Sequence, residues 1–281
     1  MKKLAFAVVM GSIAVGASAD VWSNGNIVTR QINGTSVSSQ ADDTRGATFG
    51  LSAWALADAP GPFSVADNYT VGNSNILVTS VKVLGYYNTA TTANLDRAFI
   101  KIYQGTPDTG SPTLVYGDFD NSRATSTVFA TDPNNSNSAI YRVSGSTLST
   151  ARRLQEITIG LGGGVALNAN TQYYFEWALD SSSSTPPNSG YIAVAPLALS
   201  RTANGPDGLV HYGNGSPTGG GTVGDPNWGW ASLKNDSEAN VEASKVDLPF
   251  SLEYTAVPEP GTMIAVGAGL VALAARRRRK A

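Results

Sequence analysis

Cysteine is absent from this chain of 281 residues, and histidine occurs once, at His211. Without cysteine there is no disulfide, no thiolate metal ligand and no cysteine nucleophile. With one imidazole, a multi-histidine metal site cannot form within one chain, and a serine–histidine–aspartate site would have to use His211. The sequence has no Gly-x-Ser-x-Gly elbow, and Val210 and Tyr212 indicate that His211 lies near a strand end. We therefore expect a structural or surface role for His211.

Charged residues are also scarce, at 14% of the chain, and their two signs are segregated. Residues 1–19 and 257–281 hold seven of the 19 basic residues but only one of the 21 acidic residues, Glu259. The body between them has 12 basic and 20 acidic residues, a formal net charge of −8. Such a body should repel nucleic acid and anionic membranes, so we expect no nucleic-acid partner.

The first 19 residues have the three parts of a secretory signal peptide. Lys2 and Lys3 form a positive n-region, residues 4–15 form an apolar h-region, and Ala17-Ser18-Ala19 is an A-x-A cleavage site. We expect signal peptidase to cut after Ala19, so that the mature chain begins at Asp20.

The other end of the chain contains a second signal. Pro258-Glu259-Pro260 precedes an uncharged apolar run at 262–275 and then a basic cluster. This run is shorter than the roughly 20 residues that a relaxed spanning helix needs. Because prolines resist helix, the span should start near Gly261. The positive-inside rule predicts that the basic cluster stays in the cytoplasm and that the body from residue 20 to about 257 lies outside.

This arrangement resembles the PEP-CTERM sorting signal of Gram-negative bacteria. The matching positions are Val257, Pro258, Glu259 and Pro260 at the motif and Arg276, Arg277, Arg278 and Arg279 at the basic stop. The resemblance implies that an exosortase, an integral-membrane cysteine protease, removes the tail after transient anchoring in the inner membrane. Such proteins are typically surface or matrix proteins of bacteria that make exopolysaccharide and form biofilm, which makes exopolysaccharide a candidate partner.

Residues 20–256 show strand patterns and little helical periodicity. The clearest runs of β-branched and aromatic residues are 76–87, 97–103, 154–159, 171–179 and 248–254. Turn clusters separate them, and Gly162-Gly163-Gly164 is interpreted as a turn as well. About twelve strands without a composition shift predict one all-β domain, a β-sandwich of jelly-roll type. The predicted organisation is a signal peptide at 1–19, a sandwich at 20–256 and a sorting signal at 257–281 with a short transmembrane helix.

The order of segments between residues 76 and 254 also resembles a secreted bacterial β-sandwich domain of no assigned activity. That resemblance brings no catalytic residues with it. Glycosidase chemistry needs two facing carboxylates at a set separation, and the acidic residues of this chain show no such pattern.

Two groups of residues are candidates for binding. The stretch Gly117 to Asn121 (GDFDN) offers oxygen ligands for Ca²⁺ but lacks the glycine and the later glutamate of an EF-hand loop. Turn formation is the favoured interpretation, Ca²⁺ is the alternative, and no other cofactor is expected. Trp228 and Trp230 would share one face of a strand and could stack on sugar rings, although a core role is favoured.

The leading hypothesis is therefore an exported, non-enzymatic surface or extracellular-matrix protein. A carbohydrate-binding module is the alternative, and a secreted hydrolase is the least expected class.

We predict two processing events that intact mass spectrometry will detect in the native host. The extracellular species should begin at Asp20 and end between Pro258 and Gly261, because the signals at both ends are removed. A species that keeps residues 276–280 and stays with the membrane would contradict the second event and indicate a permanent anchor.

Overall fold

The computed structural model describes residues 19–24, 28, 30–38, 51–52, 64–87, 91–107, 112–142, 151–181, 192–194, 208–212, 229–232, 248–257 and 268–269. Apart from the helical pair Ala268 and Gly269, the regular structure in these ranges is β-strand. The all-β prediction is confirmed.

The first layer is a seven-stranded sheet that we call the β6 sheet. Its order is β1 (Asp20–Ser23), β18 (Phe250–Ala256), β6 (Ile76–Tyr87), β13 (Gln155–Leu167) and β9 (Ala124–Phe129). Beyond the end of β18, β6 also pairs with β15 (Ile192–Val194), which in turn pairs with β4 (Leu51–Ser52). All these pairs are antiparallel.

The second layer has six antiparallel strands, and we call it the β14 sheet. Its order is β17 (Gly229–Ser232), β16 (Leu209–Tyr212), β5 (Ser64–Thr70), β14 (Gln172–Asp180), β7 (Arg97–Gln104) and β8 (Thr113–Asp118). β5 was not among the strands predicted from sequence. Its central residues Asp67 and Asn68 are polar, although both are buried.

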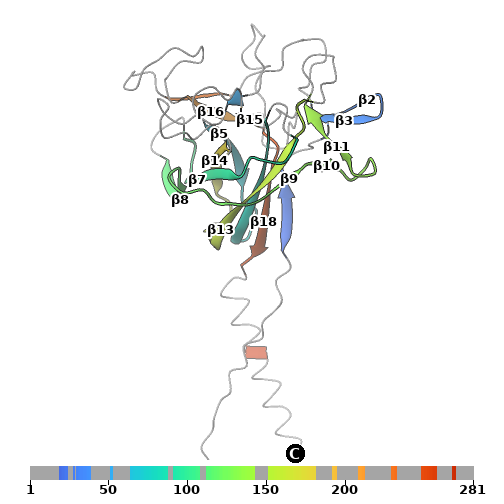
Figure 1. Ribbon diagram of the computed structural model, residues 1–281. Coiled ribbons are helices and arrows are strands. Elements are labelled where there is room, and N and C mark those ends of the chain that lie inside the picture. The colour runs from blue at the N-terminus through green and yellow to red at the C-terminus, as the bar shows by residue number, and fades with distance from the viewer. Residues whose placement is uncertain are drawn as a thin grey trace, which may run out of the picture.

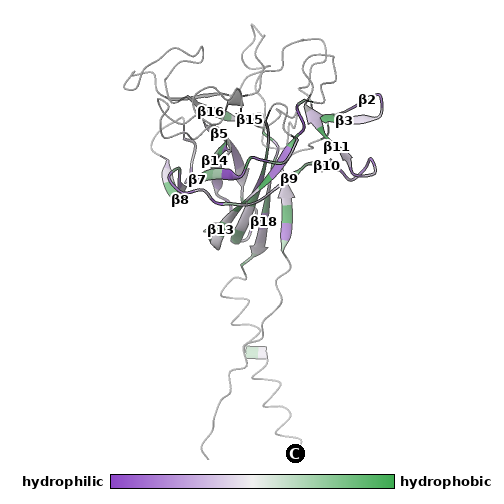
Figure 2. Ribbon diagram, viewed as in Figure 1, coloured by the Kyte–Doolittle hydropathy of each residue, from purple (hydrophilic) through white to green (hydrophobic). Residues whose placement is uncertain are grey.

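The two sheets pack face to face around one hydrophobic core. Alternate residues of β6, such as Val81 and Val83, meet Ile100 of β7 and Phe175 and Trp177 of β14 in a single buried cluster. Because side chains alternate across a strand, each strand can contribute one apolar face to this core. Hydrophobic and hydrophilic residues accordingly share the same strands (Figure 2). Each fully buried large side chain contributes roughly 1.5–3 kcal/mol.

Two small sheets lie beside one end of the sandwich (Figure 1). One contains β12 (Tyr141–Arg142), β3 (Thr35–Ser38) and β2 (Arg30–Ile32), and the other contains β10 (Thr131–Asp132) and β11 (Ser138–Ala139). Beneath them, Leu84 and Tyr86 on the outer face of β6 pack with Ala130, Ile140 and Leu154 in a second buried cluster. The outer face of the β6 sheet is therefore covered at this end.

The turn predicted at Gly162-Gly163-Gly164 is wrong. These glycines lie within β13, where the pairing with β6 shifts register between Gly160 and Val165. Gly164 has a φ of 91°, and a Cβ there would lie 2.8 Å from the Leu77 side chain. The three glycines therefore form an irregular segment inside a long strand, and at Gly164 only glycine fits so close to β6.

A buried carboxylate joins the two layers near the start of β18. Asp67 of β5 is 1% exposed, and its Oδ2 accepts hydrogen bonds from the Leu248 amide at 2.5 Å and from Asn24 Nδ2 at 3.1 Å. Its Oδ1 accepts from the Asn68 amide at 2.7 Å. The amide of Asn24 donates to the Phe250 carbonyl at 2.7 Å. Asp67 in the β14 sheet thus holds the segments that follow β1 and precede β18.

We predict that Asp67→Ala lowers the free energy of unfolding by about 3 kcal/mol or more, because it leaves buried donors without an acceptor. Urea denaturation followed by tryptophan fluorescence measures the change. The control is Asp120→Ala at an exposed position, which should change stability by less than about 0.5 kcal/mol. Equal stability of the two variants would contradict the role given to Asp67.

Candidate functional site

The pairing of β1 with β18 brings the two ends of the body together. The strands are antiparallel, with Asp20 opposite Tyr254 and Ser23 opposite Ser251. The first residue of β1 therefore lies close to the end of β18, and Ala19 is exposed immediately before it. The predicted signal-peptide junction and the start of the C-terminal motif leave the sandwich at the same end.

Val257, the first residue of the predicted motif, is still hydrogen-bonded to the sandwich. Its amide donates to the Asn75 carbonyl at 2.9 Å, and its side chain is 38% exposed. Asn75 Oδ1 accepts from the Ala169 amide at 2.8 Å. The Asn170 amide lies 3.1 Å from the Val71 carbonyl and 2.9 Å from the Gly72 carbonyl. The motif therefore begins where the loops before β6 and β14 are tied together.

We call this end of the sandwich the junction pole and define it by residues 71–75, 105–107, 168–171 and Val257. The Gly105 amide donates to the Gln172 carbonyl at 3.2 Å, which adds the end of β7 to this group. Sequence reasoning did not single out Asn75. The only local signal is that Gly72 to Asn75 have the composition of a turn. The contact between Asn75 and Val257 exists because β18 pairs with β6, which the sequence does not reveal.

The C-terminal segment matches a known family. The sequence model of the family described as "PEP-CTERM protein-sorting motif" matches residues 256–279. The chain carries a PEP-CTERM sorting motif. The match includes Val257, Pro258-Glu259-Pro260 and the four arginines at 276–279, so the predicted resemblance is confirmed. This motif implies export with transient membrane anchoring and processing by an exosortase. No curated protein and no solved structure matches the chain.

Most of the sorting residues lie outside the described residues. These are Ala17, Pro258, Glu259, Pro260, Arg276, Arg277, Arg278 and Arg279. In the described part of the chain, the structure contains no helix long and apolar enough to cross a membrane. The predicted span at 262–275 is described only at Ala268 and Gly269, which are helical and exposed.

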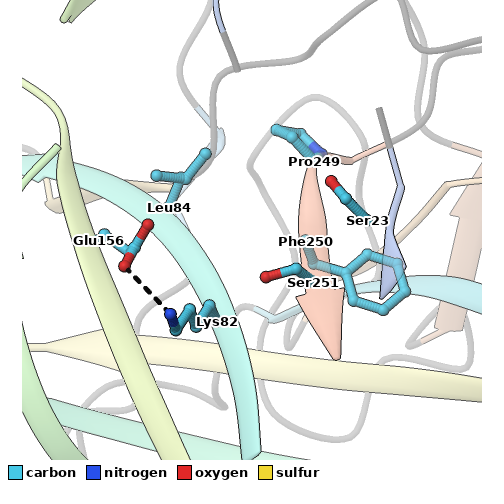
Figure 3. Close-up of a pocket in the computed structure, with 7 residues that line it drawn as sticks. All are labelled: Ser23, Lys82, Leu84, Glu156, Pro249, Phe250 and Ser251. Atoms are coloured by element: carbon cyan, nitrogen blue, oxygen red, sulfur yellow. Dashed lines mark ion pairs between the residues drawn. The ribbon is translucent and has the colours of Figure 1, made fainter. Parts of the chain in front are cut away.

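A second candidate site is a shallow cleft on the outer face of the β6 sheet (Figure 3). It offers about 30 Å³ of space to a water-sized molecule and is lined by Ser23, Lys82, Leu84, Glu156, Pro249, Phe250 and Ser251. That is below the 300–1,000 Å³ usual for ligand pockets. Phe250 is the one aromatic residue in this lining, and it is 3% exposed because it packs in the core. The cleft therefore has no exposed ring on which a sugar could stack.

The charged side chains beside this cleft contact one another. Lys82 Nζ lies 3.2 Å from Glu253 Oε1 and 3.9 Å from Glu156 Oε1, the pair drawn in Figure 3. Ser80 Oγ donates to Glu253 Oε2 at 2.8 Å. Hydrogen bonds from Ser80 and Lys82 hold the pKa of Glu253 below its usual range. One lysine is thus shared by two glutamates across three strands, β18, β6 and β13, which is the arrangement expected of a solvated sheet face.

Asp118 closes a turn, as the favoured interpretation of GDFDN predicts. Its Oδ1 accepts from the amides of Asp120 at 3.0 Å and Asn121 at 2.8 Å, and its Oδ2 accepts from Arg123 at 2.6 Å. Gly117 before it has a φ of 88°, and a Cβ there would lie 2.0 Å from the Ile100 carbonyl oxygen. Only glycine fits this position. Among the described residues, no group of three or more acidic or histidine side chains is placed to hold a metal ion.

The remaining candidates lie on the β14 sheet. Trp230 lies in β17 opposite His211 in β16, which confirms that His211 is in a strand. Trp228 lies outside the described residues. Trp177 of β14 is fully buried in the core, so its ring is not available to a sugar.

Sequence reasoning missed a buried hydrogen-bonded group around Glu176. This carboxylate is 1% exposed and accepts from Ser64 Oγ at 2.5 Å and from Tyr103 OH at 2.8 Å. Burial, together with the Glu176 charge, raises the pKa of Tyr103. The group links three adjacent strands, β5, β14 and β7, across the outer face of their sheet.

We predict that Arg123→Gln raises the pKa of Asp118, which the Arg123 hydrogen bond and the Asn121 bonds hold far below its usual range. The stabilisation by ionised Asp118 is complete above the unfolded pKa of about 3.9 and is lost as pH falls through the lower folded pKa. Carboxyl chemical shifts recorded between pH 6 and the acid limit of folding measure the titration. Arg152→Gln is the control, and an unchanged Asp118 titration in Arg123→Gln would contradict this assignment.

Proposed function

We propose that this chain is an exported, non-enzymatic surface or extracellular-matrix protein of a Gram-negative, exopolysaccharide-producing bacterium. Signal peptidase removes residues 1–19, the C-terminal segment holds the body at the inner membrane, and an exosortase then releases it toward the cell surface or the medium. The observation that carries the proposal is the sorting motif at 256–279, which begins at the last residue of β18. The match in the family comparison covers only this segment, so the role of the body is inferred from its chemistry.

The non-enzymatic part of the proposal is supported by how the polar groups of the body are used. Asp67 and Glu176 are buried carboxylates with hydrogen-bond donors from the protein itself. Asp118 is bound by a turn and by Arg123, and Glu253 by Ser80 and Lys82. These interactions stabilise the fold, and each of the four carboxylates is held by groups of the protein itself.

The jelly-roll assignment is also part of the proposal. One sheet has the strand order β5-β14-β7-β8, and the other has the neighbours β1-β18-β6. The chain therefore passes repeatedly between the two layers, as it does in a Greek-key sandwich. β13 then lies between β6 and β9 as an added strand.

Exopolysaccharide is the partner that the sorting class favours. The carbohydrate-binding alternative rests on Trp228 and Trp230. The small cleft on the β6 sheet adds no stacking surface to it, so we give the structural role priority.

We predict that replacing Pro258-Glu259-Pro260 with three alanines leaves a full-length precursor in the membrane fraction and reduces the released body to a small fraction of the normal amount. The physical reason is that the protease loses its recognition segment while the apolar span and arginines are unchanged. Immunoblots and intact mass of membrane and medium fractions measure the distribution. Replacing Pro186 and Pro187 with alanine is the control and should leave release unchanged. Normal release of the motif variant would refute the sorting role.

A further inference from the structure

The distance between the folded body and the membrane anchor is very short. Val257 is hydrogen-bonded to Asn75, and the span is expected to start near Gly261, with only Pro258-Glu259-Pro260 between them. An extended chain covers at most about 3.6 Å per residue, so Val257 lies within about 15 Å of the start of the apolar span. The headgroup layer takes up roughly 5–8 Å of that distance. This step rests on the proposed function, because it takes residues 262–275 as the anchor.

The chemistry of the junction pole suits such an approach. None of the described residues at 71–75, 105–107 and 168–171 is charged, whereas the body as a whole carries a formal net charge of −8. Gly72, Asn73, Ser74 and Asn75 are all exposed. An anionic surface would be repelled by anionic lipid headgroups, and the electrostatic penalty is smallest for an uncharged face.

Two exposed valines flank the same end of the sandwich. Val257 is 38% exposed, and Val21, the second residue of β1, is 66% exposed opposite Glu253. Asp20 adds one acidic group at the start of β1, and the nearby Glu253 is paired with Lys82. Because β1 begins here as well, Asp20 lies beside the end of β18 at the same pole.

We propose that the junction pole rests on the phospholipid headgroup surface for as long as the C-terminal anchor is in place. The folded sandwich then bounds the cleavage segment on one side and the membrane bounds it on the other. A protease that cuts there has to reach the segment from within the membrane, because the gap is too narrow for a globular domain to enter.

The absence of cysteine makes a direct test simple, since a single introduced cysteine is a unique labelling site. Asn73→Cys places a fluorophore at the junction pole, and Asn134→Cys places it at an exposed position in the β10–β11 turn. β13 runs from the far end of the sandwich to the junction pole. Its first residue pairs with the last residue of β9, and β10 follows β9 directly. The control position therefore lies at the end opposite to the junction pole.

Each uncleaved chain is purified from membranes of a host strain that lacks the sorting protease, and its ends are verified by intact mass. The chains are reconstituted into phosphatidylglycerol–phosphatidylethanolamine vesicles that carry a headgroup-bound quencher. We expect the probe at residue 73 to be quenched severalfold more than the probe at residue 134. Equal quenching at the two positions, in chains that float with the vesicles, would overturn the inference and leave the proposed function standing. Failure of both chains to associate with vesicles would instead refute the anchor and therefore both proposals.

A linker variant tests the role of the short connection. Twelve glycine and serine residues inserted between Val257 and Pro258 add a flexible reach of roughly 20 Å. We expect the chain to remain in the vesicles while quenching at residue 73 falls to the level at residue 134. Persistent quenching at residue 73 in this variant would show that the short connection is not what holds the pole at the membrane.

Discussion

The pairing of β1 with β18 is the constraint on which the arrangement of this molecule depends. It places β1, which begins directly after the predicted signal peptide, beside β18, whose last residue begins the sorting-motif match. The pairing is secured from the opposite sheet by Asp67, which holds the segments after β1 and before β18. A carboxylate buried between two layers keeps this position only while its donors are present, so the two ends of the body and the core are stabilised together.

Other hydrogen-bonded carboxylates of the body also stabilise the sandwich. Glu176 links neighbouring strands through Ser64 and Tyr103, and Asp118 fixes the turn between β8 and β9 through Arg123. Each of these carboxylates accepts hydrogen bonds from neighbouring side chains of the same sheet or turn. The stability that these groups give the body supports the proposed role as a surface or matrix component.

Several parts of the fold could be predicted from local pattern. The strand at 76–87 was predicted with the bounds that the structure has, because its apolar residues alternate and turn residues flank it. β5 was missed because Asp67 and Asn68 are polar, and their hydrogen bonds come from segments distant in the sequence. The bulge at Gly162 to Gly164 was interpreted as a turn. A run of glycines is typical of both a turn and a bulge, and only the pairing of β13 with β6 distinguishes the two. The small sheets could not be placed, since their strands are two to four residues long.

The PEP-CTERM signal could be identified without a structure, because it is a linear signal. A Pro-Glu-Pro segment, an apolar run and four arginines act through composition and order, and none of them needs a distant partner. The alternation of apolar residues likewise indicated the all-β class. The hydrogen bond between Val257 and Asn75, and the start of β1 at the same pole, became visible only in the folded chain. Those contacts join residues far apart in the chain, and their geometry follows from strand order and register, which hydrophobic pattern alone does not specify.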